Sequence, residues 1–137
     1  MNAPAVTKPV KIPGPDHPIT IERNPKRVIV TVAGRVVADT RAALTLGEAN
    51  YPAVQYVPRE DVEMALLART DRVTYCPYKG DCSYFSIPAG GERAVNAVWT
   101  YENPFPAVGS IKEYVSRNAP RNAAAGRGGA WAADAQM

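Results

Sequence analysis

Val28-Ile29-Val30-Thr31-Val32, followed by Ala33-Gly34 and then Arg35-Val36-Val37-Ala38, is the stretch that decides the fold class. β-Branched residues dominate both runs, and the glycine between them permits the tight turn of a hairpin. Upstream, Ile19-Thr20-Ile21 alternates apolar and polar residues, and the following Asn24-Pro25 is a turn signal. We therefore predict that these three runs form one antiparallel meander.

The same alternation of short strands and turn residues continues downstream. Further strands are predicted at residues 42–49, 54–57, 73–75, 83–87 and 94–101, with a loop at 76–81 and a two-residue hairpin turn at Gly90-Gly91. A helix is predicted over residues 59–67, because acidic residues follow Pro58 and complement the helix dipole, and a second over residues 108–116. The sequence thus predicts a mainly β protein, a single antiparallel domain with one or two short helices.

The length of 137 residues suits one hydrophobic core and is too small for two ordinary domains. We assign that β-rich domain to residues 17–117. The preceding residues 1–16 contain four prolines, and residues 118–137 consist mostly of alanine, glycine, asparagine and arginine. Both segments carry too little apolar surface to offset the entropy of ordering. We predict a disordered N-terminal arm and a disordered C-terminal tail.

The charge distribution argues against a nucleic-acid partner. The formal net charge is +3, but residues 1–16 carry +1 and residues 117–137 carry +2, and the remaining 11 basic and 11 acidic residues cancel. Nucleic-acid binding needs clustered cations that replace phosphate counterions. A membrane partner is not expected either, because the longest apolar runs are far below the roughly 20 residues that cross a bilayer. Without an apolar signal segment at the N-terminus, we expect a cytoplasmic protein.

Four motifs in fixed order carry a resemblance to a known family. They are His17-Pro18-Ile19-Thr20-Ile21, residues 51–62, Cys76-Pro77-Tyr78-Lys79-Gly80 and residues 96–104. Over about residues 16–116 the chain resembles the bacterial family called domain of unknown function 427. The resemblance implies a compact antiparallel β fold of the tent-like kind, similar to small zinc-bearing β domains, and it implies no established activity.

Family members are sometimes labelled nucleotidyltransferase-like. Such enzymes need a glycine-rich phosphate loop and clustered metal-binding carboxylates, and we find neither pattern in the sequence. A zinc site is not expected, because Cys76, Cys82 and His17 give only three ligands. We therefore predict no metal and no cofactor.

The two cysteines leave several interpretations open. A reducing compartment disfavours a disulfide across the loop between Cys76 and Cys82. A free cysteine at a strand end is most often a small buried hydrophobic residue. Catalysis by Cys76 would need a nearby cation, such as Lys79 or His17, to stabilise its thiolate. Cys76 is therefore a candidate catalytic residue beside a structural alternative.

Charged and aromatic residues gather at strand ends in three of these motifs. An arginine ahead of a helix start can hold a carboxylate or phosphate, and a lysine beside an aromatic suits a flat or anionic ligand. A carboxylate beside aromatics can have a raised pKa and serve as an acid or base, which makes Glu102 the second catalytic candidate. The candidate ligand-binding residues are Tyr56, Arg59, Tyr78, Lys79 and Trp99.

Each of these candidates also has a purely structural interpretation. Arg59 could pair with Asp61 or Glu63 at the surface, the loop around Lys79 could be a solvated turn, and Glu102 could simply accept a hydrogen bond.

Two functions of different classes follow from the sequence. In the first, the candidate residues converge on one pocket that binds, with or without acting on, a small anionic or aromatic ligand. In the second, the chain is a protein-interaction module or homo-oligomer that uses an exposed β edge. The sequence leaves open whether the protein is an enzyme.

Overall fold

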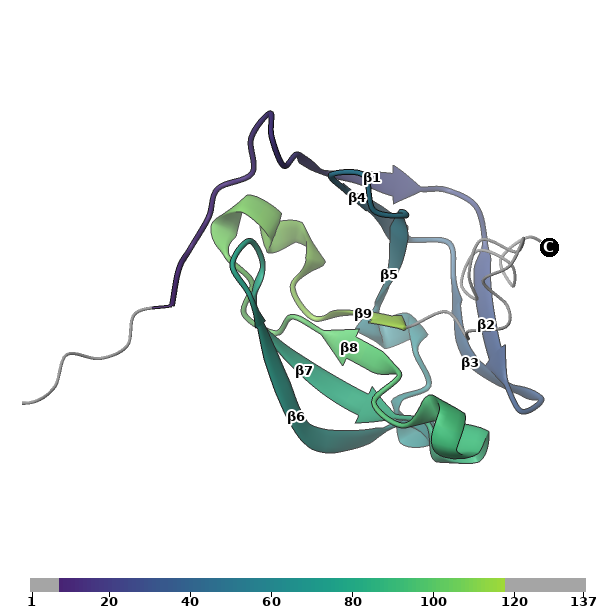
Figure 1. Cartoon of the computed structure of the whole chain (residues 1–137). Helices are drawn as coiled ribbons and strands as arrows, with labels where there is room; N and C mark the ends of the chain where they lie inside the picture. Colours follow the sequence, from purple (N-terminus) through teal and green to yellow (C-terminus); the bar gives the residue numbers. More distant parts are fainter. Residues whose placement is uncertain (1–7, 118–137) are drawn as a thin grey trace, which may run out of the picture.

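The computed structural model describes residues 8–117, which form a seven-stranded sheet and a separate two-stranded hairpin (Figure 1). The sheet has the order β1-β4-β5-β9-β8-β7-β6, and every neighbouring pair is antiparallel. The strands are β1 (Ile19–Asn24), β2 (Val28–Val32), β3 (Arg35–Thr40), β4 (Ala43–Glu48), β5 (Val54–Pro58), β6 (Ala68–Cys76), β7 (Gly80–Ser86), β8 (Val98–Thr100) and β9 (Tyr114–Arg117). The predicted fold class, a mainly antiparallel β domain, is confirmed.

The hairpin of β2 and β3 is confirmed, but the predicted three-stranded meander is wrong. Ala33 and Gly34 both have positive φ, at 52° and 78°, as a tight turn between twisted strands requires. Strand β1 pairs with β4 instead of β2. The reason is that Val28 and Val30 are fully buried, so the hairpin packs across the sheet and does not extend it.

Four short 3₁₀ segments replace the predicted helices, and the residues that the structure describes contain no α-helix. The segments are η1 (Arg59–Asp61), η2 (Met64–Leu66), η3 (Pro88–Ala94) and η4 (Pro106–Ile111). Between η1 and η2 the chain is extended at Val62, which forms a bridge with Ala38, and the amide of Glu63 donates to the carbonyl of Val37. These bonds to β3 interrupt the predicted helix over residues 59–67.

The second half of the chain differs from the prediction in two further places. The predicted helix over residues 108–116 ends at Ile111, and the chain then enters β9, which lies between β5 and β8. The predicted strand over residues 94–101 is limited to Val98–Thr100. Gly90 and Gly91 lie within η3, where Gly91 has φ of 67°, instead of forming a two-residue turn.

The two faces of the large sheet bury two separate cores. The first core lies between the β2–β3 hairpin and one face, and includes Phe85 and Val98. The second core lies on the opposite face and includes Tyr56 and Tyr101. In Figure 1 the sheet bends so that β4 and β5 face β7 and β8, with the η4 segment between their ends. Val108 and Ile111 of η4 are both fully buried in the second core.

The part of the N-terminal arm that the structure describes, residues 8–16, contacts the tip of the β6–β7 hairpin. The amide of Lys11 donates to the carbonyl of Pro77 at 2.9 Å, and the hydroxyl of Tyr75 donates to the carbonyl of Pro9 at 2.6 Å. Residues 1–7 and the predicted tail, residues 118–137, lie outside the described residues.

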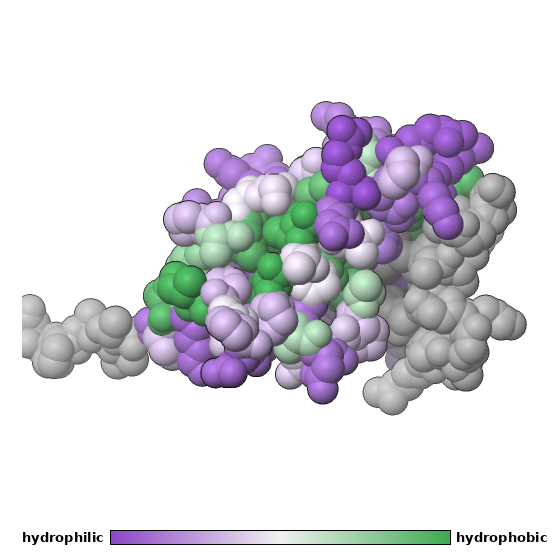
Figure 2. Space-filling model, turned by 90° about the horizontal axis from the view of Figure 1, so that it is seen from above, coloured by the Kyte–Doolittle hydropathy of each residue, from purple (hydrophilic) through white to green (hydrophobic). Residues whose placement is uncertain are grey.

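The face of the molecule that is seen from above is largely hydrophilic, with a band of apolar side chains between the polar ones (Figure 2). No helix among residues 8–117 combines the length and apolar character needed to cross a membrane.

Candidate functional site

A pocket of about 520 Å³ opens on the second-core side of the large sheet. Its buried floor is formed by Cys82 of β7 and Tyr101, which follows β8. The complete lining consists of Arg72, Cys82, Tyr84, Val95, Asn96, Trp99 and Tyr101. Three of these seven residues are aromatic, and none is acidic.

The aromatic walls are held in place by hydrogen bonds to residues outside the pocket. The indole nitrogen of Trp99 donates to the hydroxyl of Tyr56 at 3.0 Å, and the hydroxyl of Tyr84 bonds with that of Thr74 at 2.8 Å. Burial raises the pKa of both Tyr56 and Tyr101 far above the usual value, so both stay protonated. The hydrogen bonds therefore preorganise Trp99 and Tyr84, and the floor residue Tyr101 is uncharged.

Two polar residues lie at the rim of the pocket. The guanidinium of Arg72 lies over the ring of Tyr84, 4.9 Å from its centroid. Asn96 has a positive φ of 55°, and its backbone amide donates to the hydroxyl of Ser86. Its side-chain Oδ1 accepts a hydrogen bond from the hydroxyl of Thr70 at 2.6 Å. A left-handed conformation costs energy in a residue other than glycine, although asparagine tolerates it better than most.

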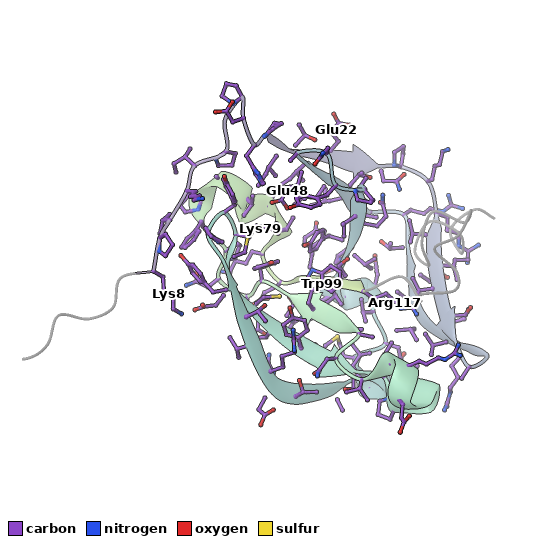
Figure 3. All side chains as sticks on the ribbon, viewed as in Figure 1. Lys8, Glu22, Glu48, Lys79, Trp99 and Arg117 are labelled. Atoms are coloured by element: carbon purple, nitrogen blue, oxygen red, sulfur yellow. The ribbon has the colours of Figure 1, made fainter. Side chains whose placement is uncertain are left out.

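A polar cluster of His17, Glu48, Tyr78 and Lys79 lies beside the second core. Lys79 is only 7% exposed, and its ammonium donates to Oε1 of Glu48, while Oε2 of Glu48 bonds to Nε2 of His17 at 2.7 Å. The ring of His17 stacks on Tyr78 with a centroid distance of 4.0 Å and an interplanar angle of 4°. Figure 3 shows Glu48 and Lys79 close together, with Trp99 of β8 below them in the view.

This cluster is neighbour to the pocket but is not part of its lining. The ammonium of Lys79 lies 5.9 Å from the centroid of Tyr101, which belongs to the pocket floor. Burial by itself would raise the pKa of Glu48, but the hydrogen bonds from Lys79 and His17 outweigh burial and hold that pKa below its usual value. Lys79 and Glu48 thus neutralise each other, which leaves neither charge free for a ligand.

Arg59 and Glu102 lie on the opposite face of the sheet. Successive residues of a strand point to opposite faces, and Trp99 and Thr100 are adjacent in β8. Trp99 belongs to the second core, whereas Thr100 accepts a hydrogen bond from Arg59 at 3.2 Å. Arg59 also donates to Glu102 at 3.3 Å.

The structure therefore separates the sequence-predicted site residues into two groups. Trp99 alone lines the pocket, with Tyr56 behind it, Cys76 packed against the second core, and Tyr78 and Lys79 in the neighbouring polar cluster. Arg59 and Glu102 form the other group. The structure does not bring the seven residues into one cavity.

The chemistry expected of Glu102 also changes. A second arginine, Arg69, pairs with the same carboxylate. Burial would raise the pKa of Glu102, but the hydrogen bonds and charges of Arg69 and Arg59 outweigh it and lower that pKa. Of the two interpretations that the sequence left open, the raised pKa is not found, and Glu102 is instead a carboxylate that accepts hydrogen bonds. Glu102 is a fixed anion at neutral pH and not a proton donor.

The pocket thiol is poorly suited to nucleophilic chemistry. Cys82 is 2% exposed, and burial raises the pKa of its thiol. Both cysteines are free thiols. Among residues 8–117, no group of three or more His, Cys, Asp or Glu side chains could hold a metal ion.

Sequence reasoning missed Arg72, Tyr84, Asn96 and Glu48. One signal was available for Glu48, because Leu44 and Leu46 share its face of β4, and a carboxylate in that register must point into a core. A second signal was the alternation of Cys82 and Tyr84 in β7, which places both on one face. Arg72 had no such signal, since it is one of several arginines in exposed strand positions.

Comparison with known proteins agrees with the motifs and the fold. No curated protein sequence matches the chain. The family model described as a domain of unknown function, DUF427, matches residues 20–124, which is well over half of the chain. The chain therefore belongs to the DUF427 family.

Proposed function

We propose that this protein binds a small, flat ligand in the pocket that Trp99 and Tyr84 line. The observation that carries the proposal is the pocket itself, a preorganised hollow of about 520 Å³ with three aromatic side chains in its lining. Ligand pockets have volumes of about 300–1,000 Å³ and are lined by aromatic residues with a few fixed polar groups. Arg72 and Asn96 supply those polar groups.

The surroundings of the pocket support binding more than catalysis. Glu102 and Arg59 lie on the other face of the sheet, Glu48 and Lys79 are paired with each other, and the pocket thiol of Cys82 is buried. A nucleophile activated by a neighbouring base is the usual mark of covalent catalysis, and the lining offers a thiol without such a base. The proposed role is therefore that of a binding domain.

The alternative role, pairing through a β edge, has less support. Strands β1 and β6 are the edges of the large sheet. The β6 edge carries Arg69, Asp71 and Arg72, and its register with β7 is interrupted between Arg69 and Val73. Charges and irregular pairing at an edge are features that prevent strand-to-strand association.

A titration monitored at the indole group of Trp99 tests the proposal. The sequence has two tryptophans, so the variant Trp131→Phe leaves Trp99 as the only indole N–H signal in an NMR spectrum. We expect flat aromatic compounds to shift this signal in a saturable way and to raise the melting temperature. A ligand at 100 times its dissociation constant stabilises by about 2.7 kcal/mol.

A pair of rim variants shows where the ligand binds. Val95 lines the pocket and is 56% exposed, whereas Val73 is 61% exposed and does not line it. Val95→Phe places a ring at the mouth and should weaken binding, while Val73→Phe should leave it unchanged. Equal effects of the two variants, or no saturable shift with any aromatic compound, would contradict the proposal.

A further inference from the structure

The aromatic side chains of the pocket form their hydrogen bonds within the protein, whereas two polar side chains keep donors for a ligand. The indole of Trp99 donates to Tyr56, and the hydroxyl of Tyr84 bonds with Thr74. The aromatic walls can therefore stack with a ligand, but their polar ends are occupied within the protein.

Arg72 keeps its donors and its charge available. The ion pairs among residues 8–117 do not include Arg72, and its guanidinium is placed by the face of Tyr84. A guanidinium stacked on an aromatic ring still directs its N–H donors outward in the plane of the fork. Arg72 is also the only charged residue of the lining.

Asn96 offers a second set of donors. Its Oδ1 accepts a hydrogen bond from the hydroxyl of Thr70, which fixes the orientation of the side-chain amide. The Nδ2 of that amide has no acceptor among the residues that the structure describes. The backbone of Asn96 is fixed by the hydrogen bond to Ser86 and by its left-handed conformation. An amide held in this way supplies two N–H donors at a constant position.

From these contacts we infer that the pocket selects planar aromatic anions, carboxylates or phosphates attached to a ring, and discriminates against aromatic amines. Arg72 would pair with the anionic group, Asn96 would donate to an acceptor of the ligand, and Trp99 and Tyr84 would stack on its ring. The inference rests on the proposed function of this pocket and adds the charge and hydrogen-bonding character of its ligand.

The physical basis is that the lining has one uncompensated positive charge and open donors, but no carboxylate. An ammonium group in the pocket would face the guanidinium without an anion to neutralise it, whereas a carboxylate gains charge-assisted hydrogen bonds. The chemistry of the anion, carboxylate or phosphate, is the same for a guanidinium fork, so probes of both kinds are needed.

The experiment compares naphthoate, naphthyl phosphate, naphthamide and naphthylmethylamine, which share one ring system and differ in the attached group. Binding is measured from the shift of the Trp99 indole signal in the Trp131→Phe protein at neutral pH. We expect at least one anionic probe to bind about tenfold or more tightly than the amine, with the neutral amide between them, as expected for loss of a charge-assisted contact.

Two variants assign this preference to named residues. Arg72→Gln should remove the advantage of the anionic probes over the amide, whereas Arg35→Gln, an equal change in net charge at an exposed position of β3 outside the pocket, should retain it. Asn96→Asp keeps the shape of the side chain and the acceptor for Thr70 but replaces the open donors with an anion. It should weaken anion binding about tenfold.

The outcomes distinguish a wrong ligand class from a wrong binding site. If the amine binds as tightly as the anions, or if Arg35→Gln and Arg72→Gln act alike, the inferred ligand class is wrong while aromatic binding stands. If Asn96→Asp leaves anion binding unchanged, the role given to Asn96 is wrong. If none of the four probes shifts the Trp99 signal, the proposed function fails and this inference with it.

Discussion

The ammonium group of Lys79 and the carboxylate of Glu48, 31 residues apart in sequence, form an ion pair inside the second core. The two side chains are 9% and 16% exposed. A buried charge that loses its partner is strongly destabilising, whereas replacing both partners with apolar residues is often neutral. The pair therefore joins the β6–β7 hairpin to β4 and makes the stability of the fold depend on both residues together.

The first prediction concerns this ion pair. Lys79→Met should lower the free energy of unfolding by about 3 kcal/mol, because it removes the ammonium partner of the buried carboxylate of Glu48 and leaves His17 as its remaining partner. The double variant Glu48→Leu with Lys79→Met should recover most of that loss, since Leu continues the apolar register of Leu44 and Leu46. Urea denaturation measures both.

The exposed pair Arg27 and Asp39 provides a control, because both side chains are 43% exposed. Arg27→Gln should change the urea midpoint very little. A double variant of Glu48 and Lys79 that is less stable than either single variant would contradict the prediction.

The second prediction is a pH dependence. The pKa of Glu48 is lower in the folded protein than in the unfolded chain, so the carboxylate contributes stability at pH values above its unfolded pKa, which is about 4.3. That contribution is lost as the pH falls through the folded pKa. We expect the stability difference between the wild-type protein and Glu48→Gln to be full at pH 6 and to shrink below about pH 4. Glu102 is present in both proteins, so its own titration cancels in the comparison.

Urea denaturation of the two proteins across this pH range provides the measurement. A stability difference that stays constant down to pH 2, or one that grows on acidification, would show that Glu48 is not held as a carboxylate by Lys79 and His17.

The third prediction concerns the hydrogen bond between Trp99 and Tyr56. Tyr56→Phe leaves the ring in place but removes the acceptor of the partly buried indole N–H of Trp99, which should cost about 1–2 kcal/mol of stability. The Trp99 indole signal should also broaden or move, because the pocket wall loses its anchor. Tyr51→Phe is the matched control, since Tyr51 is 63% exposed. Equal stability of the two variants would contradict the structural role of Tyr56.

The fourth prediction separates the two cysteines. Cys82 is 2% exposed and the pKa of its thiol is raised by burial, whereas Cys76 is only partly buried. Because the thiolate is the reactive form, a thiol reagent should modify native Cys76 faster than native Cys82. Measurements on Cys76→Ser and Cys82→Ser assign the two rates, and denaturant should make them similar. Faster labelling of Cys82 in the native protein would show that the pocket floor opens.

The amino-acid sequence alone was enough to predict the class of the fold. Runs of β-branched residues and turn signals such as Gly34 indicate strands and hairpins through local sterics, and the β2–β3 hairpin followed from them. The predicted helix over residues 59–67 failed because Val62 forms a bridge with Ala38 and the amide of Glu63 donates to Val37, which are contacts with the distant strand β3. Short segments have weak local preferences, so such contacts decide their conformation.

Part of the site was also visible in the sequence. Trp99, Tyr78 and Lys79 were identified from their positions at strand ends, but their partners were not. Alternation along a strand fixes which residues share a face, and this places Trp99 and Thr100 on opposite sides. It does not say which face receives Arg59, because that depends on how the chain after β5 passes the sheet.

The sequence thus determined the β architecture and the family, since both follow from local backbone preferences and from ordered motifs. Only the tertiary structure decided which charges neutralise each other. Lys79 pairs with Glu48 and Arg59 with Glu102, across 31 and 43 residues, while Arg72 is placed over Tyr84 without a carboxylate partner among the described residues. Coulomb interactions depend on distance in space and on burial, and the order of residues along the chain fixes neither of these.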